Sequence, residues 1–83
     1  MLFKVVRENE TTYYVPEHIR KISISPVYGK EDIFDVALYL DTEMEIVHVC
    51  HSFEKAERFV SRLYELMNIS ENRIVDLNKD IQL

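Results

Sequence analysis

The spacing of apolar residues changes once along the chain, at Ser52, and this change constrains the fold more than any other feature. Before Ser52, apolar and polar residues alternate, as they do in strands with one buried face. Over 53–68, apolar residues recur every three or four positions, as on one side of a helix. This stripe consists of Phe53, Ala56, Phe59, Val60, Leu63, Tyr64 and Met67. A chain of 83 residues has room for one core, so we expect one small domain.

The alternating part divides into short segments at polar runs and at prolines, which cannot donate to a sheet ladder. Predicted strands cover 2–7, 12–15, 21–25, 33–40 and 45–50, with a single turn at 16–19 and a further short strand at 73–77. Ser52 is the expected N-cap of the helix. The fold class is therefore α+β, with an antiparallel β-meander of four to five of these strands and one amphipathic helix packed on one face. We expect one domain over 1–77 and a frayed tail over 78–83.

The hairpin of 33–40 and 45–50 predicts two contrasting faces. A two-residue turn at 42–43 places Leu38 opposite Val47 and so keeps the apolar residues together. The face that the helix is expected to cover consists of Phe34, Val36, Leu38, Val47 and Val49. The reverse face is expected to consist of Asp35, Ala37, Tyr39, Ile46, His48 and Cys50.

Composition excludes several classes of site. The only glycine is Gly29, whereas dinucleotide fingerprints and P-loops need several glycines to bring backbone amides close to a phosphate. The only cysteine is Cys50, which excludes a disulfide framework and any four-cysteine metal site. The chain starts without the apolar stretch of a signal peptide and has no apolar run long enough to span a membrane. We therefore expect a cytoplasmic protein without a cofactor.

Charge is distributed unevenly along the chain. The net charge is −5, and residues 31–54 carry seven acidic side chains and no Lys or Arg. Such a segment repels phosphate backbones, so direct binding of nucleic acid is disfavoured. It either forms a solvated face that keeps the protein soluble, or it attracts a basic partner by complementary charge.

Reactive side chains gather only at 48–52, where the last main strand runs into the helix. Cys50 lies near the helix start, which lowers thiol pKa values, and His48 is close enough in sequence to act as a base. On a strand, however, His51 points away from His48 and Cys50, and catalytic zinc usually needs three ligands. A buried, inert cysteine is the simpler interpretation. We predict no catalytic and no metal-binding residues, and keep a thiol- or metal-dependent activity centred on Cys50, with His48 and His51, as the alternative.

The reverse face is more apolar than a sheet face that meets only water. A patch of this kind with an acidic rim is typical of an interaction surface. We therefore expect a small acidic, non-enzymatic interaction or regulatory protein. Its partner would be another protein, such as a basic, nucleic-acid-handling one, or a second copy of the chain. The candidate partner-binding residues are Asp35, Tyr39, Asp41, Glu43, Ile46 and His48. A weak nucleic-acid-binding module that uses Arg20, Lys21 and Lys30 is a further alternative.

Overall fold

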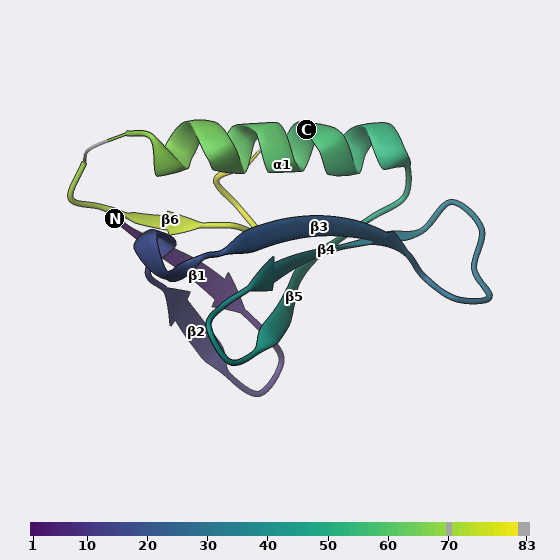
Figure 1. Cartoon of the computed structure of the whole chain (residues 1–83), viewed down its shortest axis with the longest axis horizontal. Coiled ribbons are helices and arrows are strands. Elements are labelled where there is room, and N and C mark those ends of the chain that lie inside the picture. Colours follow the sequence, from purple (N-terminus) through teal and green to yellow (C-terminus); the bar gives the residue numbers. More distant parts are fainter. Residues whose placement is uncertain (70, 82–83) are drawn as a thin grey trace.

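A computed structural model describes residues 1–69 and 71–81 (Figure 1). These residues form six strands, one α-helix and one turn of 3₁₀ helix, which confirms the α+β class. In chain order the elements are β1 (Leu2–Val6), β2 (Thr11–Tyr14), η1 (Pro16–His18), β3 (Lys21–Pro26), β4 (Phe34–Tyr39), β5 (Met44–Cys50), α1 (Phe53–Met67) and β6 (Ile74–Asp76).

The strands form two three-stranded sheets instead of the single meander that the sequence predicts. Their orders are β2-β1-β6 and β3-β4-β5, and β6 runs parallel to β1. Two local causes explain the difference. The buried Pro16 and the η1 turn separate β2 from β3, so these neighbours in sequence do not pair. After α1 the chain returns along the molecule and enters beside β1 in the same direction, as Figure 1 shows.

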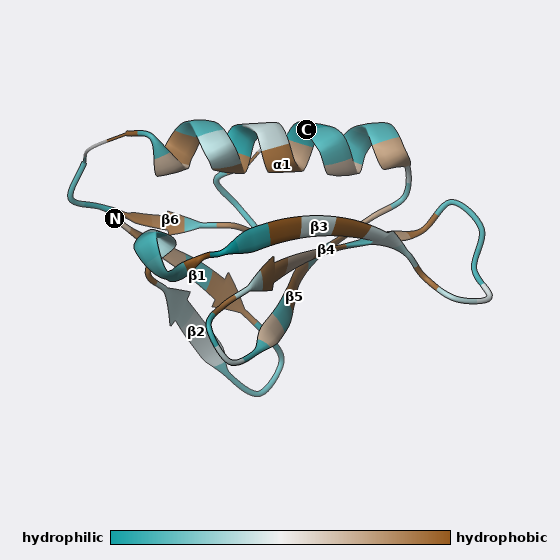
Figure 2. Ribbon diagram, in the orientation of Figure 1, coloured by the Kyte–Doolittle hydropathy of each residue, from teal (hydrophilic) through white to brown (hydrophobic). Residues whose placement is uncertain are grey.

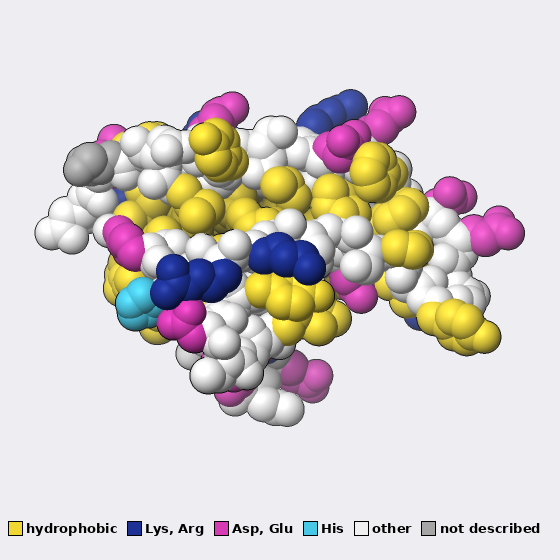
Figure 3. Space-filling model, in the orientation of Figure 1, with side chains coloured by type: hydrophobic (Ala, Val, Ile, Leu, Met, Phe, Trp, Pro, Cys, Tyr) yellow, Lys and Arg dark blue, Asp and Glu magenta, His cyan; other side chains and the backbone are white. Residues whose placement is uncertain are grey.

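Helix α1 has nearly the predicted bounds, but its buried side differs from the predicted stripe. Phe53 and Tyr64 of that stripe are 48% and 65% exposed, and Leu66, which lies outside it, is buried. The hydroxyl oxygen of Ser52 accepts a hydrogen bond from the Lys55 amide at 3.1 Å, so Ser52 caps the helix. The helix turns its apolar side toward β3, β4 and β5 (Figure 2). Its buried residues are Ala56, Phe59, Leu63 and Leu66. A band of apolar side chains remains visible between α1 and β3 in Figure 3. Within the described residues, no helix combines the length and the apolar character that crossing a membrane requires.

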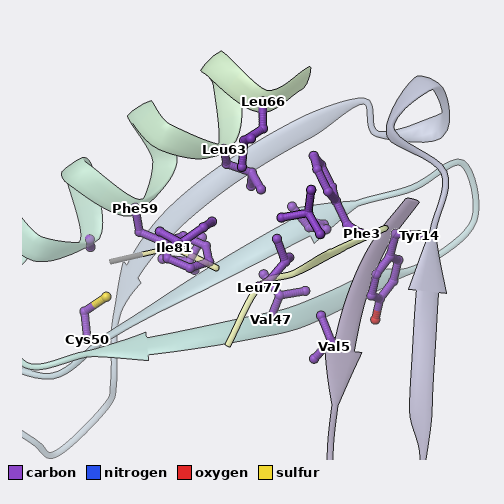
Figure 4. Close-up of a cluster of buried hydrophobic side chains, with 14 residues drawn as sticks. Phe3, Val5, Tyr14, Val47, Cys50, Phe59, Leu63, Leu66, Leu77 and Ile81 are labelled. Carbon is purple, nitrogen blue, oxygen red and sulfur yellow. The ribbon is translucent and has the colours of Figure 1, made fainter. Parts of the chain in front are cut away.

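One hydrophobic core joins both sheets and the helix (Figure 4). Phe3 and Val75 come from the first sheet, Leu38 from the second, and each is at most 1% exposed. The expected C-terminal tail starts as a turn in which the Asp76 carboxylate accepts hydrogen bonds from the amides of residues 78 and 79. Ile81 then packs into the core with 8% of its surface exposed. The chain from 78 to 81 therefore lies against the molecule, and the rest of the predicted tail, 82–83, lies outside the described residues.

A β-bulge changes the predicted register of β4 and β5. Val36 lies opposite His48, but the next residue along β4, Ala37, lies opposite Ile46, so Val47 is an extra residue in β5. Val47 is still buried, near Val5 and Leu77 in Figure 4. Beyond the bulge the alternation reverses: His48 and Cys50 face α1, and Val49 faces away. The predicted pairing of Leu38 with Val47 is therefore wrong, because Leu38 lies opposite Glu45.

Arg7 links the two sheets. Its guanidinium donates hydrogen bonds of 3.0 Å to the Thr12 hydroxyl and the Tyr14 hydroxyl in β2, and to the backbone carbonyl of Ile46 in β5. The Glu45 carboxylate lies 3.6 Å away. Because Ile46 adjoins the bulge, Arg7 satisfies a carbonyl at the place where the ladder is irregular.

Candidate functional site

The face of the β3-β4-β5 sheet that points away from α1 is the first candidate surface, and we call it the back face. The register places nine residues on it in three rows across the strands: Lys21, Tyr39 and Met44; Ser23, Ala37 and Ile46; Ser25, Asp35 and Val49. Met44, Ile46 and Val49 are each 44–49% exposed. Three large apolar side chains thus lie half-exposed side by side on β5.

Polar groups surround these apolar side chains. The ammonium group of Lys21 lies 4.5 Å from the centroid of the Tyr39 ring, a cation–π contact at one end of the back face. Asp35 is half-buried at the other end, between Ser25 and Val49. A half-apolar face with charged groups at its rim resembles the composition of transient protein interfaces.

A groove of about 300 Å³ lies between β2 and the turn that joins β4 to β5, and we call it the acidic groove. On one side it is lined by Thr12, Tyr13, Tyr14, Val15 and His18. On the other side it is lined by Leu40, Asp41, Thr42, Glu43 and Glu45. Adjacent strand residues alternate, so Tyr14 is buried while Tyr13 is 49% exposed. The groove therefore combines an exposed aromatic ring with three carboxylates.

Basic neighbours already compensate two of these three carboxylates. Arg20 Nε donates to Asp41 Oδ1 at 2.6 Å, and this hydrogen bond, together with the attraction between the charges, lowers the pKa of Asp41. The same contact raises the pKa of Arg20. Glu45 lies beside Arg7. Among the salt bridges of the described residues none involves Glu43, so this carboxylate is the one best placed to meet a cation from outside.

Five of the six predicted partner-binding residues lie on the back face or on the turn that joins β4 to β5. Asp35, Tyr39 and Ile46 lie on the back face, and Asp41 and Glu43 lie on the adjoining turn. The sixth residue, His48, does not lie with them.

His48 lies on the opposite face of the sheet, so its predicted place beside Ile46 and Tyr39 is wrong. The extra residue in the bulge turns His48 toward α1, where its ring stacks on Phe59 with centroids 4.3 Å apart and planes 4° apart. Burial lowers the pKa of His48 below its ordinary value of 6.5. His48 therefore belongs to the core side of the sheet and not to the candidate surface.

The residues near Cys50 do not form a reactive group. Cys50 is 3% exposed, and burial raises the pKa of its thiol by more than the nearby Lys55 lowers it. Thiolate, the nucleophilic form, is therefore disfavoured. His51 is exposed on the connection to α1. Among the described residues, no three His, Cys, Asp or Glu side chains lie close enough together to hold a metal ion.

Several residues of the candidate surface are not predicted by the sequence patterns. Met44 belongs to β5 and not to the turn, and Val49 is turned outward by the bulge. Tyr13, Val15 and His18 reach the acidic groove from the other sheet. Alternation in β2 predicts that one of the two adjacent tyrosines is exposed, but only the tertiary structure places that tyrosine beside the β4–β5 turn.

Comparisons of the chain with protein-family models, with curated proteins and with solved structures give no match. The function is therefore argued from the surface itself.

Proposed function

We propose that this protein is a non-enzymatic interaction module that binds a protein partner through the back face and the acidic groove. The observation that carries the proposal is the exposure of Met44, Ile46 and Val49, each 44–49%, on strands whose other face is buried. Contiguous exposed apolar side chains on a small protein typically mark a binding surface.

The groove favours a basic partner. A Lys or Arg side chain packs its aliphatic stem against apolar surface and keeps its charge at the end. In the acidic groove the stem would lie along Tyr13 and Val15, and the charge would meet Glu43. The net charge of −5 would also steer a basic partner toward the protein. A regulatory role would follow if this surface competes with another ligand of the partner.

The test compares partner retention by the wild-type protein and by variants of similar stability. Ile46→Glu places a charge in the middle of the back face, and we expect at least about tenfold weaker binding of any partner retained by the wild type, or about 1.4 kcal/mol. Glu43→Lys reverses the charge in the groove and should weaken binding of a basic partner by a smaller factor. Ser61→Glu, on the exposed side of α1, is the matched control and should bind as the wild type does.

Quantitative mass spectrometry of crosslinked, retained proteins identifies the partner, and calorimetry with that purified partner gives the affinity. Retention that is equal for Ile46→Glu and Ser61→Glu would contradict the proposal. So would retention of nucleic acid alone, which would favour the phosphate-binding alternative.

A further inference from the structure

We propose that two copies of this chain associate through the free edge of β3 into a symmetric dimer. The two β3 strands pair antiparallel about a two-fold axis at Ser23. The two three-stranded sheets then become one six-stranded sheet, with both α1 helices on the same side. This inference does not depend on the proposed function, because the back face and the acidic groove stay open in the dimer.

The edge of β3 is free for pairing. Within the described residues β3 pairs only with β4, and Val27 donates to the Ile33 carbonyl at 2.9 Å at the end of this ladder. Hydrogen-bonded residues alternate along an antiparallel pair, so Ser25, Ser23 and Lys21 direct their amides and carbonyls toward β4. The backbone groups of Ile22 and Ile24 consequently point outward. An edge of this kind is a template for another strand.

The backbone selects one register. With Ser23 opposite itself, Ile22 lies opposite the second copy's Ile24, and the two such pairs exchange four backbone hydrogen bonds. A shift toward the end of β3 places Ile22 opposite Pro26, which has no amide hydrogen. A shift the other way places the charged Arg20 opposite Ile24. The register centred on Ser23 keeps both Ile22–Ile24 pairs and places Arg20 and Pro26 opposite each other, at the ends of the contact.

The Ser23 hydroxyl supports this register independently. Its oxygen is buried and has no hydrogen-bond partner among the described residues. An unsatisfied buried hydroxyl is costly, and such groups are rare in folded proteins. At the axis the two Ser23 residues occupy a non-hydrogen-bonded position, where opposite side chains are closest. A rotation about χ1 then lets one hydroxyl donate to the other.

Charge is also complementary across the interface between the two β3 strands, which we call the seam. Each row of the back face continues into the second copy, so Asp35 and Ser25 are followed by the second copy's Lys21. Two strand spacings, about 10 Å, separate the backbone of Asp35 from that of this lysine. The small Ser25 leaves the space between them open, and a lysine stem with an aspartate spans that distance. Symmetry makes this ion pair twice.

The helix side of the seam is apolar in each copy. Tyr64 and Phe53 are 65% and 48% exposed. Tyr64 lies near Pro16 and Glu17, just before β3, and Phe53 contacts Phe34, which pairs with β3. These contacts place Tyr64 beside the η1 turn that leads into β3, and Phe53 beside the β4 strand next to β3.

Pairing along β3 brings together the apolar band between α1 and β3 of one copy and the same band of the second copy. A strand edge alone buries less than the roughly 800 Å² per partner of a stable interface. The helix flank, with Tyr64 and Phe53 facing the second copy, extends the contact. A second copy of the chain therefore matches the edge of β3 in its backbone hydrogen bonds, its charges and its apolar surface.

Charge reversal provides the first test. Lys21→Glu brings two carboxylates together at each end of the seam, and Asp35→Lys brings two ammonium groups together there. Each variant alone should be largely monomeric by sedimentation velocity, at a concentration where the wild type has twice the chain mass of 9.9 kDa. An equimolar mixture should recover a heterodimer, because both pairs across its seam then join opposite charges. The recovery distinguishes a lost interface from a misfolded variant.

Cysteine crosslinking provides the second test and reads the register. Ser23→Cys should form an intermolecular disulfide on mild oxidation, since opposite residues at the axis lie within the Cα separation that a disulfide requires. Ser25→Cys is the matched control and should crosslink much more slowly, because its two copies lie four residues apart along the strands. The native Cys50 is buried and should not interfere. A wild type that stays monomeric at high concentration, a mixture that does not recover a dimer, or equal crosslinking at 23 and 25 would each overturn the proposal.

Discussion

The two faces of the β3-β4-β5 sheet are built from alternating residues of the same strands, yet they end in different states. On the covered face Val36 and Leu38 are fully buried, whereas Ile46 and Val49 on the back face are 44% and 49% exposed. Both faces carry large apolar side chains, but one helix covers only one of them. The covered face therefore forms the core of the fold, whereas the large apolar side chains of the back face stay half-exposed.

The covered face is closed by two elements. Helix α1 packs over its middle, and β1 closes the end where β5 bends at the bulge. Arg7 fixes that second closure through its hydrogen bonds to β2 and β5. No corresponding closure of the back face occurs within the described residues.

Truncation of one large apolar side chain on each face should lower the free energy of unfolding by very different amounts. Leu38→Ala should lower the free energy of unfolding by about 2–5 kcal/mol, because it removes a fully buried side chain and leaves a cavity. Ile46→Ala on the back face should cost less than about 1 kcal/mol, because the side chain is already half in water. Equilibrium urea unfolding measures both. Equal losses would mean that the back face also contributes to the core.

Removal of the Arg7 side chain, which links the two sheets, should lower the free energy of unfolding by an intermediate amount. Arg7→Ala leaves the Tyr14 hydroxyl and the Ile46 carbonyl without their donor, so we expect a loss of about 1–3 kcal/mol. Arg62→Ala is the matched control. Arg62 makes an exposed pair with Glu65 at 3.1 Å on α1, and such pairs contribute little. Urea unfolding of the two variants should separate them clearly, and similar losses would show that Arg7 does not join the sheets.

The smallest expected effect is a pH dependence of stability that is caused by His48 on the covered face. Burial lowers the pKa of His48 in the folded protein, so the unfolded chain takes up its proton at a higher pH. Stability from this source is complete above about pH 6.5 and falls as the pH drops through that value toward the lower folded pKa. His48→Phe keeps a ring against Phe59 and should flatten this part of the profile in thermal unfolding between about pH 7.5 and 5.

His51→Gln is the control for that measurement, because His51 is exposed beside the same helix start. It should leave the acid dependence as in the wild type. A profile that flattens equally in both variants would show that burial of His48 is not the cause.

Local patterns predict most of the elements. The switch of period at Ser52 predicts both the cap and the extent of α1, which ends at Met67, one residue before the expected end. Prolines and polar runs divide the strands nearly where the structure has them. These features depend on neighbours in sequence, so a single chain is enough to predict them.

The candidate surface is predicted less completely. Asp35, Tyr39 and Ile46 lie on the back face as expected, because alternation holds on each side of the bulge. His48 and Val49 exchange faces because one extra residue in β5 reverses the alternation after it. The bulge lets Val47 join Val5 and Leu77 in the core and leaves the Ile46 carbonyl to accept from Arg7. All three partners are distant from β5 in sequence.

The amino-acid order alone therefore determined the elements of this protein, its cap, and the excess of apolar residues over what one helix can cover. Periodicity and capping act over a few residues, where the chain itself supplies every partner. Tertiary packing sets the pairing of β6 with β1, the bulge at Val47 in β5, and the faces of the sheet on which His48 and Val49 lie. Those choices depend on the packing of distant segments into one shared core, and no short stretch of sequence contains that information.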